Sequence, residues 1–183
     1  MAFGNSDMKK ILKTARRFAL PLVGLTVLIT GGVVTTSYAH GGRGSAESSI
    51  KAAFVYNFAK LTTWPSDGDI VLGIVGSSEA GDTIKRIVDG KPAGGHTISV
   101  KEIGAGEAKS CQMVFVCGGG GVPSVGSAHV LTVGEADGFA DKGGAIGFET
   151  ADGKVHFAIN MGAVKKAGLK IGDKLKAIGR VIE

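Results

Sequence analysis

Hydrophobic and polar positions follow helical spacing in residues 45–65. Lys51 and Lys60 fall away from the apolar stripe, and Ser45 stands where an N-cap residue is expected. Proline disfavours helical geometry in the residue before it, so we expect the helix to end at Trp64. The residues predicted to lie along the buried stripe are Ile50, Ala53, Phe54, Asn57, Phe58 and Leu61.

Short apolar runs alternate with helical patterns in the rest of the chain. Strands are predicted at residues 70–75, 97–102, 113–116, 130–133, 145–150 and 154–159. Helices are predicted at residues 79–88, 161–167 and 173–182. Residues 151–153 mark the turn of a hairpin between the last two strands. The alternation predicts a single three-layer α/β domain, with a mostly parallel sheet, helices on both faces and a C-terminal hairpin.

The first 39 residues have the pattern of a signal peptide. A basic region precedes an apolar run at residues 18–34, and small residues at Ser37 and Ala39 suit cleavage after Ala39. Arg16 and Arg17 leave a twin-arginine route open, and the length of the run leaves an uncleaved anchor open. The expected organisation is a cleaved signal peptide at 1–39, a flexible lead-in at 40–46 and one domain at 47–183.

The basic character of the chain comes mainly from this leader. The whole chain has a formal net charge of +5, but residues 1–39 hold five of its 21 basic residues and one of its 16 acidic ones. The remaining 16 basic and 15 acidic residues give a charge of +1. The charge therefore gives no support to a nucleic-acid partner.

Two cysteines are too few for a disulfide-stapled secreted scaffold. Cys111 and Cys117 bracket a predicted strand, so their α-carbons would lie about 20 Å apart, whereas a disulfide needs less than about 7 Å. Two unpaired, partly buried thiols are the favoured interpretation. A bridge between subunits stays open, as does a bridge within the pair if the strand curls.

No residue pattern indicates catalysis, a metal or a cofactor. Ser124 and Ser127 lie in a glycine-rich loop without the nucleophile elbow of hydrolases. Residues 73–81 lack the phosphate-binding motifs and are better explained as a strand-to-helix turn capped by Ser77 or Ser78. The scattered histidines lack metal-ligand spacing. They are His40, His96, His129 and His156.

Three polar or aromatic residues have ordinary structural explanations. Asn57 would tie the helix to backbone groups of a neighbouring loop, because a bare buried amide is costly. Asn160, between a predicted strand and helix, suits an N-cap. Trp64, the only tryptophan, could anchor an interface or cover the core.

In their order and spacing, several segments of residues 47–182 resemble the YfiR-like family of periplasmic proteins. The most specific similarities are a YNF motif followed by WP, a double glycine within an F-A-x-x-GG-x-I-x-F motif, and a segment from Asn160 to Leu169. The motif residues are Tyr56, Asn57, Phe58, Trp64, Pro65, Gly143, Gly144, Asn160, Gly168 and Leu169.

The resemblance implies a regulator. Members of this family bind the periplasmic sensory domain of an inner-membrane diguanylate cyclase and hold it inactive, which lowers cyclic di-GMP, exopolysaccharide production and biofilm formation. Release comes from sequestration by an outer-membrane peptidoglycan-binding lipoprotein or from a changed redox state, and the family forms dimers. This chain departs from better-known members by having fewer cysteines, and by residues 118–126 where most have a helix.

The sequence therefore predicts a periplasmic binding protein that represses a diguanylate cyclase. The surfaces expected to bind the partner lie around Tyr56, Lys60, Lys165 and Lys166. An alternative is a periplasmic small-molecule sensor for a different membrane partner, with a pocket near Gly76 or Gly121. A third hypothesis is an enzyme on an α/β scaffold.

Overall fold

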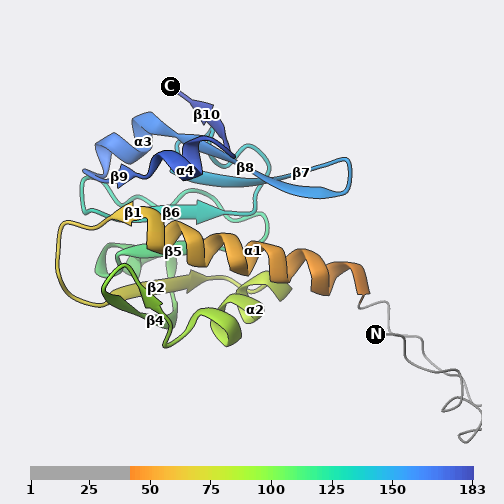
Figure 1. Cartoon of the computed structure of the whole chain (residues 1–183), viewed down its shortest axis with the longest axis horizontal. Helices are drawn as coiled ribbons and strands as arrows, with labels where there is room; N and C mark the ends of the chain where they lie inside the picture. The colour runs from red at the N-terminus through yellow and green to blue at the C-terminus, as the bar shows by residue number, and fades with distance from the viewer. Residues whose placement is uncertain (1–41) are drawn as a thin grey trace, which may run out of the picture. The chain divides into compact units, whose positions relative to one another are not determined.

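An eight-stranded sheet organises residues 42–183, the part of the chain that this computed structural model describes (Figure 1). The expected signal peptide at 1–39 and its cleavage site lie outside the described residues. The strands are β1 (Thr62–Thr63), β2 (Ile70–Val75), β3 (Pro92–Ala93), β4 (His96–Ile103), β5 (Met113–Val116), β6 (Leu131–Gly134), β7 (Ile146–Ala151), β8 (Lys154–Asn160), β9 (Lys170–Ile171) and β10 (Arg180–Ile182).

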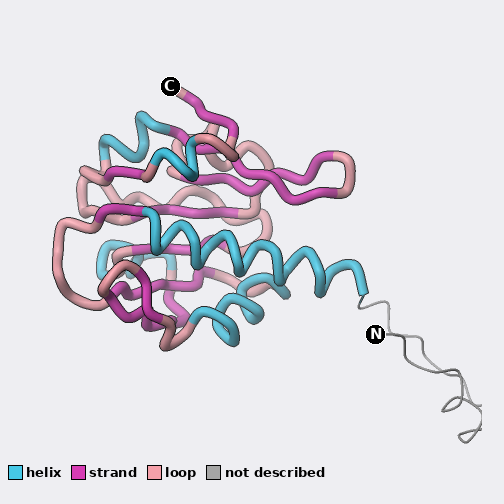
Figure 2. The backbone as a smooth tube through the Cα atoms, viewed as in Figure 1, coloured by secondary structure: helices cyan, strands magenta, loops and turns pink. Residues whose placement is uncertain are grey.

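The order across the sheet is β10-β8-β7-β6-β5-β2-β4-β3, and β1 and β9 pair separately. Figure 2 shows the strand segments in magenta and the helices in cyan. The pairs from β4 to β7 across the sheet are all parallel, whereas β8 is antiparallel to β7. Asp152 and Gly153 connect β7 to β8 with positive φ angles of 52° and 70°, as a tight primed turn requires. The predicted α/β fold, with its mostly parallel sheet and antiparallel pair near the C-terminus, is confirmed.

Helices of different kinds cover the two faces of the sheet. The described helices are α1 (Gly42–Leu61), α2 (Glu79–Val88), the 3-10 helix η2 (Ala105–Ser110), α3 (Met161–Lys166) and α4 (Asp173–Lys176). α1 and α2 pack over the larger core. On the opposite face, Ala108 of η2 packs with Val114 and Phe139, and loops complete the layer. In residues 42–183, no helix combines the length and apolarity needed to cross a membrane.

The buried face of α1 differs from the predicted stripe. Ile50 is 45% exposed, and Ala53 and Asn57 are also exposed. Phe58 is buried as predicted, while Phe54 and Leu61 are only partly buried. The prediction gave weight to large apolar residues, but small ones let the helix pack closely against α2 and the sheet. The buried residues of α1 are Ser48, Ala52, Val55, Phe58 and Ala59.

Both ends of α1 also differ from the prediction. The described helix begins at Gly42, before the predicted cap Ser45, so residues 42–46 of the expected lead-in are helical, while residues 40 and 41 lie outside the described range. Its first turns lie against α2, where a Cβ on Gly44 would meet Glu79. The helix ends at Leu61 instead of Trp64, because Thr62 and Thr63 form β1 and pair with β9.

The C-terminal segment is the other departure. A helix over 173–182 was predicted, but α4 stops at Lys176 and β10 then pairs in parallel with β8. Gly179 has no side chain and packs directly against the Phe157 ring, which leaves no room for a Cβ. Glycine weakens a helix, and the following Val181 and Ile182 favour a strand.

Candidate functional site

The carboxyl ends of β2 and β5 meet where the chain leaves the sheet toward opposite faces. After β2 the chain enters α2, which packs on the larger core, and after β5 it enters the loop whose Val122 and Val125 pack on the smaller one. In open α/β sheets such a switch point is the usual place for a binding crevice. Ser78 and Gly118 lie here, together with Glu135 at the end of the adjacent β6.

Glu135 is the centre of a hydrogen-bonded cluster at this edge. Its carboxylate accepts hydrogen bonds from Lys51 Nζ at 2.8 Å, Ser78 Oγ at 2.7 Å and the Gly118 N–H at 3.0 Å. Only 9% of the Glu135 side chain and 12% of the Lys51 side chain are exposed. Lys51 also pairs with Glu47 at 2.8 Å, one helical turn earlier. The cluster thus joins α1, α2 and the ends of two strands.

The same contacts set the ionisation of the pair. Burial of Glu135 disfavours its charged form, but the hydrogen bonds from Lys51, Gly118 and Ser78 outweigh it and lower the pKa of the carboxyl group. Burial likewise works against the charge on Lys51, yet its bonds to Glu135 and Glu47 raise its pKa. Both groups are therefore charged at neutral pH.

The cluster holds the fold together and leaves little room for a ligand. Ser78 also accepts from the Gly81 N–H at 3.1 Å, which is the N-cap of α2 that the sequence predicted as one of two alternatives. The hollow beside Gly76 measures about 90 Å³. Ligand pockets typically measure about 300–1,000 Å³, so the pocket hypothesised near Gly76 has too little volume.

Tyr56 and Lys60, which were predicted to face a partner, lie together at one end of α1. The Tyr56 hydroxyl donates to the Pro92 carbonyl at 2.7 Å. Lys60 Nζ lies 5.2 Å from the centre of the Tyr56 ring, and Lys91 Nζ lies 5.3 Å from it. Lys91 was not predicted, because it reaches the ring from a loop distant in sequence. We call Tyr56, Lys60 and Lys91 the Tyr56 cluster.

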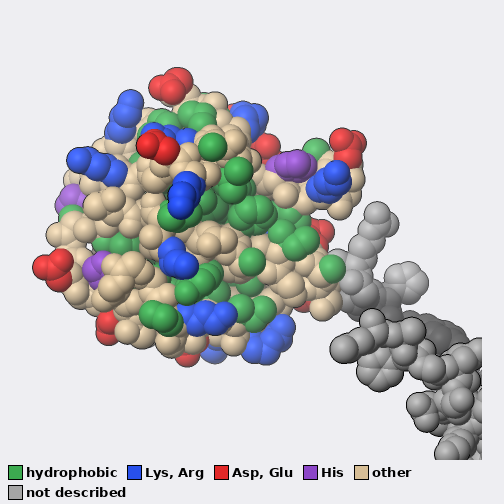
Figure 3. Space-filling view, in the orientation of Figure 1, with side chains coloured by type: hydrophobic (Ala, Val, Ile, Leu, Met, Phe, Trp, Pro, Cys, Tyr) green, Lys and Arg blue, Asp and Glu red, His purple; other side chains and the backbone are tan. Residues whose placement is uncertain are grey.

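The second predicted surface is the last turn of α3. Lys165 and Lys166 are exposed there, where a positive charge suits the carboxyl end of a helix. Within residues 42–183, no hydrogen bond or ion pair joins them to the Tyr56 cluster. On the face that carries α1, basic side chains lie both near the middle and toward the edge, whereas acidic ones lie mainly toward the edge (Figure 3).

Other motif residues have structural roles at the end of α1. The prediction for Asn57 is wrong, because its side chain is exposed and ties no loop to the helix in the described structure. Phe58 packs edge-on against Phe157, with ring centres 5.0 Å apart. Trp64 packs on the core and donates from Nε1 to the Ala59 carbonyl at 2.9 Å, so it covers the helix end. Pro65 is exposed beside it.

The double-glycine motif surrounds a buried ring. Gly143 turns the chain with a φ of 98°, and Gly144 lies so close to Phe139 that a Cβ would overlap the ring. Gly134 contacts the other side of the ring in the same way. The phenylalanine and the glycines of this motif are therefore explained by packing.

Asn160 fulfils its predicted capping role. Its side chain accepts from the Ala163 N–H at 2.8 Å and donates to the Ala140 carbonyl at 2.8 Å. Gly168 ends α3 with a φ of 69°, a conformation that glycine adopts without strain. Leu169 follows as a buried core residue. Like the double glycine, these residues shape the domain.

Both cysteines are buried and unpaired. Cys111 belongs to the core on one face of the sheet and Cys117 to the core on the other, so the sheet separates the two sulfur atoms. Burial raises the pKa of Cys117 and keeps it in the thiol form. The favoured interpretation of two unpaired thiols agrees with this arrangement.

The histidines do not converge. His96 lies against the Gly68 carbonyl at 2.7 Å, and His129 against the Ala167 carbonyl at 3.0 Å. Among the described residues, no three metal-ligating side chains come together. His40 lies outside the described range.

Two comparisons with known proteins relate the chain to others. The sequence profile of the YfiR/HmsC-like family matches residues 48–180. Among solved structures, that of a conserved domain protein from Vibrio cholerae has a TM-score of 0.48 and 12% sequence identity, over 73% of this chain. The match spans 60% of the Vibrio chain. No curated protein matches the sequence significantly.

Proposed function

The chain belongs to the YfiR/HmsC-like family, and from this membership we propose that it is a periplasmic regulator of cyclic di-GMP signalling. The observation that carries the proposal is the extent of the family match, which runs from the first turns of α1 to β10. The family is regulatory rather than catalytic. We therefore assign this chain a binding function.

In its specific form, the proposal is that the protein represses a membrane diguanylate cyclase. The domain binds the periplasmic sensory domain of the cyclase more tightly in its inactive conformation than in its active one. About 5 kcal/mol of differential affinity shifts such a pair from mostly active to mostly inactive. Repression lowers cyclic di-GMP, and with it exopolysaccharide and biofilm formation.

The Tyr56 cluster is the surface that best suits this role. It combines an aromatic ring with the two exposed ammonium groups of Lys60 and Lys91, both of which are in no ion pair within residues 42–183. Aromatic residues are enriched in protein interfaces, and charged groups around them attract a partner of opposite charge. A partner surface with exposed carboxylates would complement it. Lys165 and Lys166 provide the second proposed contact.

The remaining features of the proposal follow the family. The protein reaches the periplasm through the signal peptide at residues 1–39 and forms a homodimer. An outer-membrane peptidoglycan-binding lipoprotein releases the cyclase by sequestering the repressor. Release by a disulfide within the Cys111–Cys117 pair is not proposed, because the sheet separates the two thiols.

Deletion of the gene tests the repressor function directly. We expect cellular cyclic di-GMP to rise on deletion and to fall again when the full chain is restored. A version without residues 1–39 remains in the cytoplasm and does not restore repression. An unchanged cyclic di-GMP level on deletion, or full rescue by the version without residues 1–39, contradicts the proposal.

The surface is tested separately by charge reversal in the restored chain. The K60E/K91E double variant is expected to leave cyclic di-GMP high while the protein accumulates normally. The control is Lys154→Glu, which reverses an exposed lysine on the β7–β8 hairpin, outside the Tyr56 cluster. Equal repression by both variants would exclude this surface and leave the repressor function intact.

A further inference from the structure

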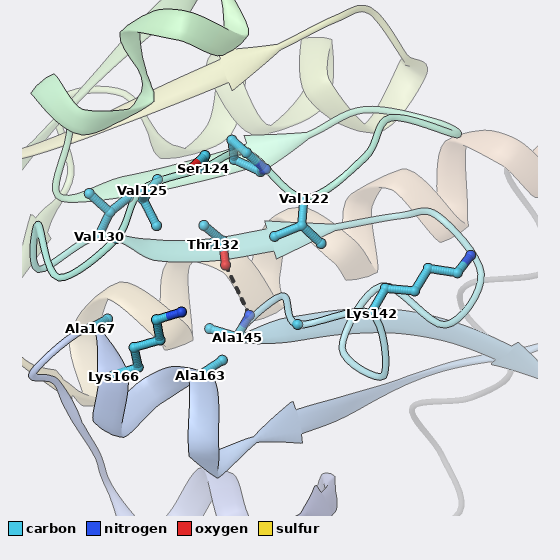
Figure 4. A pocket seen from close by; sticks show the side chains of 13 residues that line it. Val122, Ser124, Val125, Val130, Thr132, Lys142, Ala145, Ala163, Lys166 and Ala167 are labelled. Atoms are coloured by element: carbon cyan, nitrogen blue, oxygen red, sulfur yellow. Dashed lines mark hydrogen bonds between the residues drawn. The ribbon is translucent and has the colours of Figure 1, made fainter.

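A cavity of about 350 Å³ lies beside the glycine-rich loop, between that loop, β6 and α3 (Figure 4). Val122 is one of its lining residues, and it is next to Gly121, near which the small-molecule sensor hypothesis places a pocket. Apolar walls come from Val122, Val125 and Val130 on one side and from Ala163 of α3 on the other. Its volume falls in the range of small-molecule pockets, unlike the hollow near Gly76.

The lining is polar as well as apolar, and two of its polar side chains are Thr132 and Lys166. Thr132 is only 3% exposed, and its hydroxyl oxygen accepts a hydrogen bond from the Ala145 N–H at 2.9 Å. Among residues 42–183 that hydroxyl has no acceptor for its own hydrogen, which is left for a ligand. The Lys166 side chain rises from α3 toward Thr132 and Val130 (Figure 4). Lys166 forms no ion pair in the described part of the chain.

The charges around the cavity point to an anion with a single charge. None of the residues that line it is acidic. Lys142 contributes its aliphatic stem, but its ammonium group points away and donates to the Asp137 carbonyl at 2.8 Å (Figure 4). The Lys166 ammonium group therefore remains as the charged donor, and Thr132 and Ser124 contribute the side-chain hydroxyl groups of the lining. An ammonium group and a hydroxyl group can each donate to one oxygen of a carboxylate.

We propose that this cavity binds a small carboxylic acid with an apolar body. The carboxylate accepts hydrogen bonds from Lys166 Nζ and the Thr132 hydroxyl, and the apolar body lies against the valine and alanine walls. Such a ligand fills apolar space and satisfies the unused Thr132 donor at once. Ligand binding here does not require the membrane partner to be known, although Lys166 also belongs to the second proposed partner contact.

Titration of the purified protein with octanoate, followed by calorimetry and by amide shifts in NMR spectra, tests the site. We expect saturable binding with shifts centred on Thr132 and Ala145. Octan-1-ol has the same apolar body without the charge and should bind at least about tenfold more weakly, since a charge-assisted hydrogen bond contributes that much. Inorganic phosphate should bind less well than octanoate.

Three variants make the assignment specific. Lys166→Gln should weaken octanoate binding at least about tenfold, whereas Lys165→Gln, which changes the adjacent exposed lysine outside the cavity lining, should leave it unchanged. Ala163→Phe fills the cavity from α3 and should abolish binding, with thermal melting as the check on folding. Absence of saturable binding, equal affinity for octanoate and octan-1-ol, stronger binding of phosphate, or wild-type affinity in K166Q overturns the proposal.

Discussion

Lys51 Nζ lies 2.8 Å from Glu135 Oε1, although 84 residues separate the two in sequence. The pair joins the first helix to the end of the sixth strand. Removing one member of a buried ion pair leaves the other charge poorly compensated, and without Glu135 the Lys51 ammonium group would keep only Glu47, whose side chain is 40% exposed. The energetic importance of this contact can therefore be measured directly.

Glu135→Gln is expected to lower the free energy of unfolding by about 3 kcal/mol, measured by urea denaturation. The substitution leaves Lys51 without its buried partner and weakens the bonds from Ser78 and Gly118. Glu102→Gln, which breaks the exposed pair with Lys85, is the matched control and should have little effect. A K51M/E135Q double variant as stable as E135Q alone would show that the two residues act through this contact.

Because of Lys51 and Glu135, we expect the free energy of unfolding to be highest in a range around neutral pH and to fall toward acid and toward alkaline pH. The pKa of Glu135 is lowered by folding, so its contribution is present above its unfolded value of about 4.3 and is lost as pH falls through the folded value. The pKa of Lys51 is raised, so its contribution is present below about 10.4 and is lost as pH rises through the folded value. Urea midpoints measured from acid to neutral pH should fall less steeply toward acid in E135Q than in the wild type. If the urea midpoints of E135Q and of the wild type fall equally steeply toward acid pH, this assignment is contradicted.

Gly144→Ala should destabilise the domain by about 2 kcal/mol, because the added methyl group overlaps the buried Phe139 ring. Gly119→Ala is the control, since a Cβ there meets no atom within 4 Å and its φ is not positive. Thermal unfolding of the two variants provides the measurement. Equal melting temperatures would mean that the ring moves aside at no cost.

The two thiols should not react in the folded protein. Cys111 and Cys117 are buried, so a disulfide reagent cannot reach either sulfur atom in the folded protein. Burial also raises the pKa of Cys117, which disfavours its reactive thiolate form. We expect both to react only after denaturation, and a reducing agent to leave the melting temperature unchanged. A disulfide-linked dimer on a non-reducing gel would instead support a bridge between subunits.

Elements with a strong local pattern could be predicted from the sequence almost residue for residue. The predicted ranges 70–75, 79–88 and 113–116 are those of β2, α2 and β5. β2 and β5 are short apolar runs, and α2 is an amphipathic segment capped by Ser78. Local sequence is sufficient there because burial and propensity favour the same structure.

Tertiary contacts decided the features that could not be predicted. The buried face of α1 depends on small residues such as Ala52 and Ala59, whose value lies in close packing and not in hydrophobicity. Lys51 was predicted to lie away from the buried stripe, because no residue near it in sequence indicates its contact with Glu135. A partial signal was present, since Glu135 directly follows an apolar strand, at the end of the sheet where polar groups of other strands gather. Tyr56 and Lys60 of the Tyr56 cluster were predicted from the sequence. Lys91 was not, because it joins them from a loop that is distant in sequence.

The pairing of β1 with β9 has a consequence for how the domain forms. Residues just after the first helix hydrogen-bond with residues 170 and 171, and β10 completes the sheet beside β8. Contacts that close so long a loop are slow to form, and they require residues 170–182 to be present. A nascent chain therefore cannot complete this pair or the edge of the sheet until those residues have been synthesised, and chaperones have that interval in which to act.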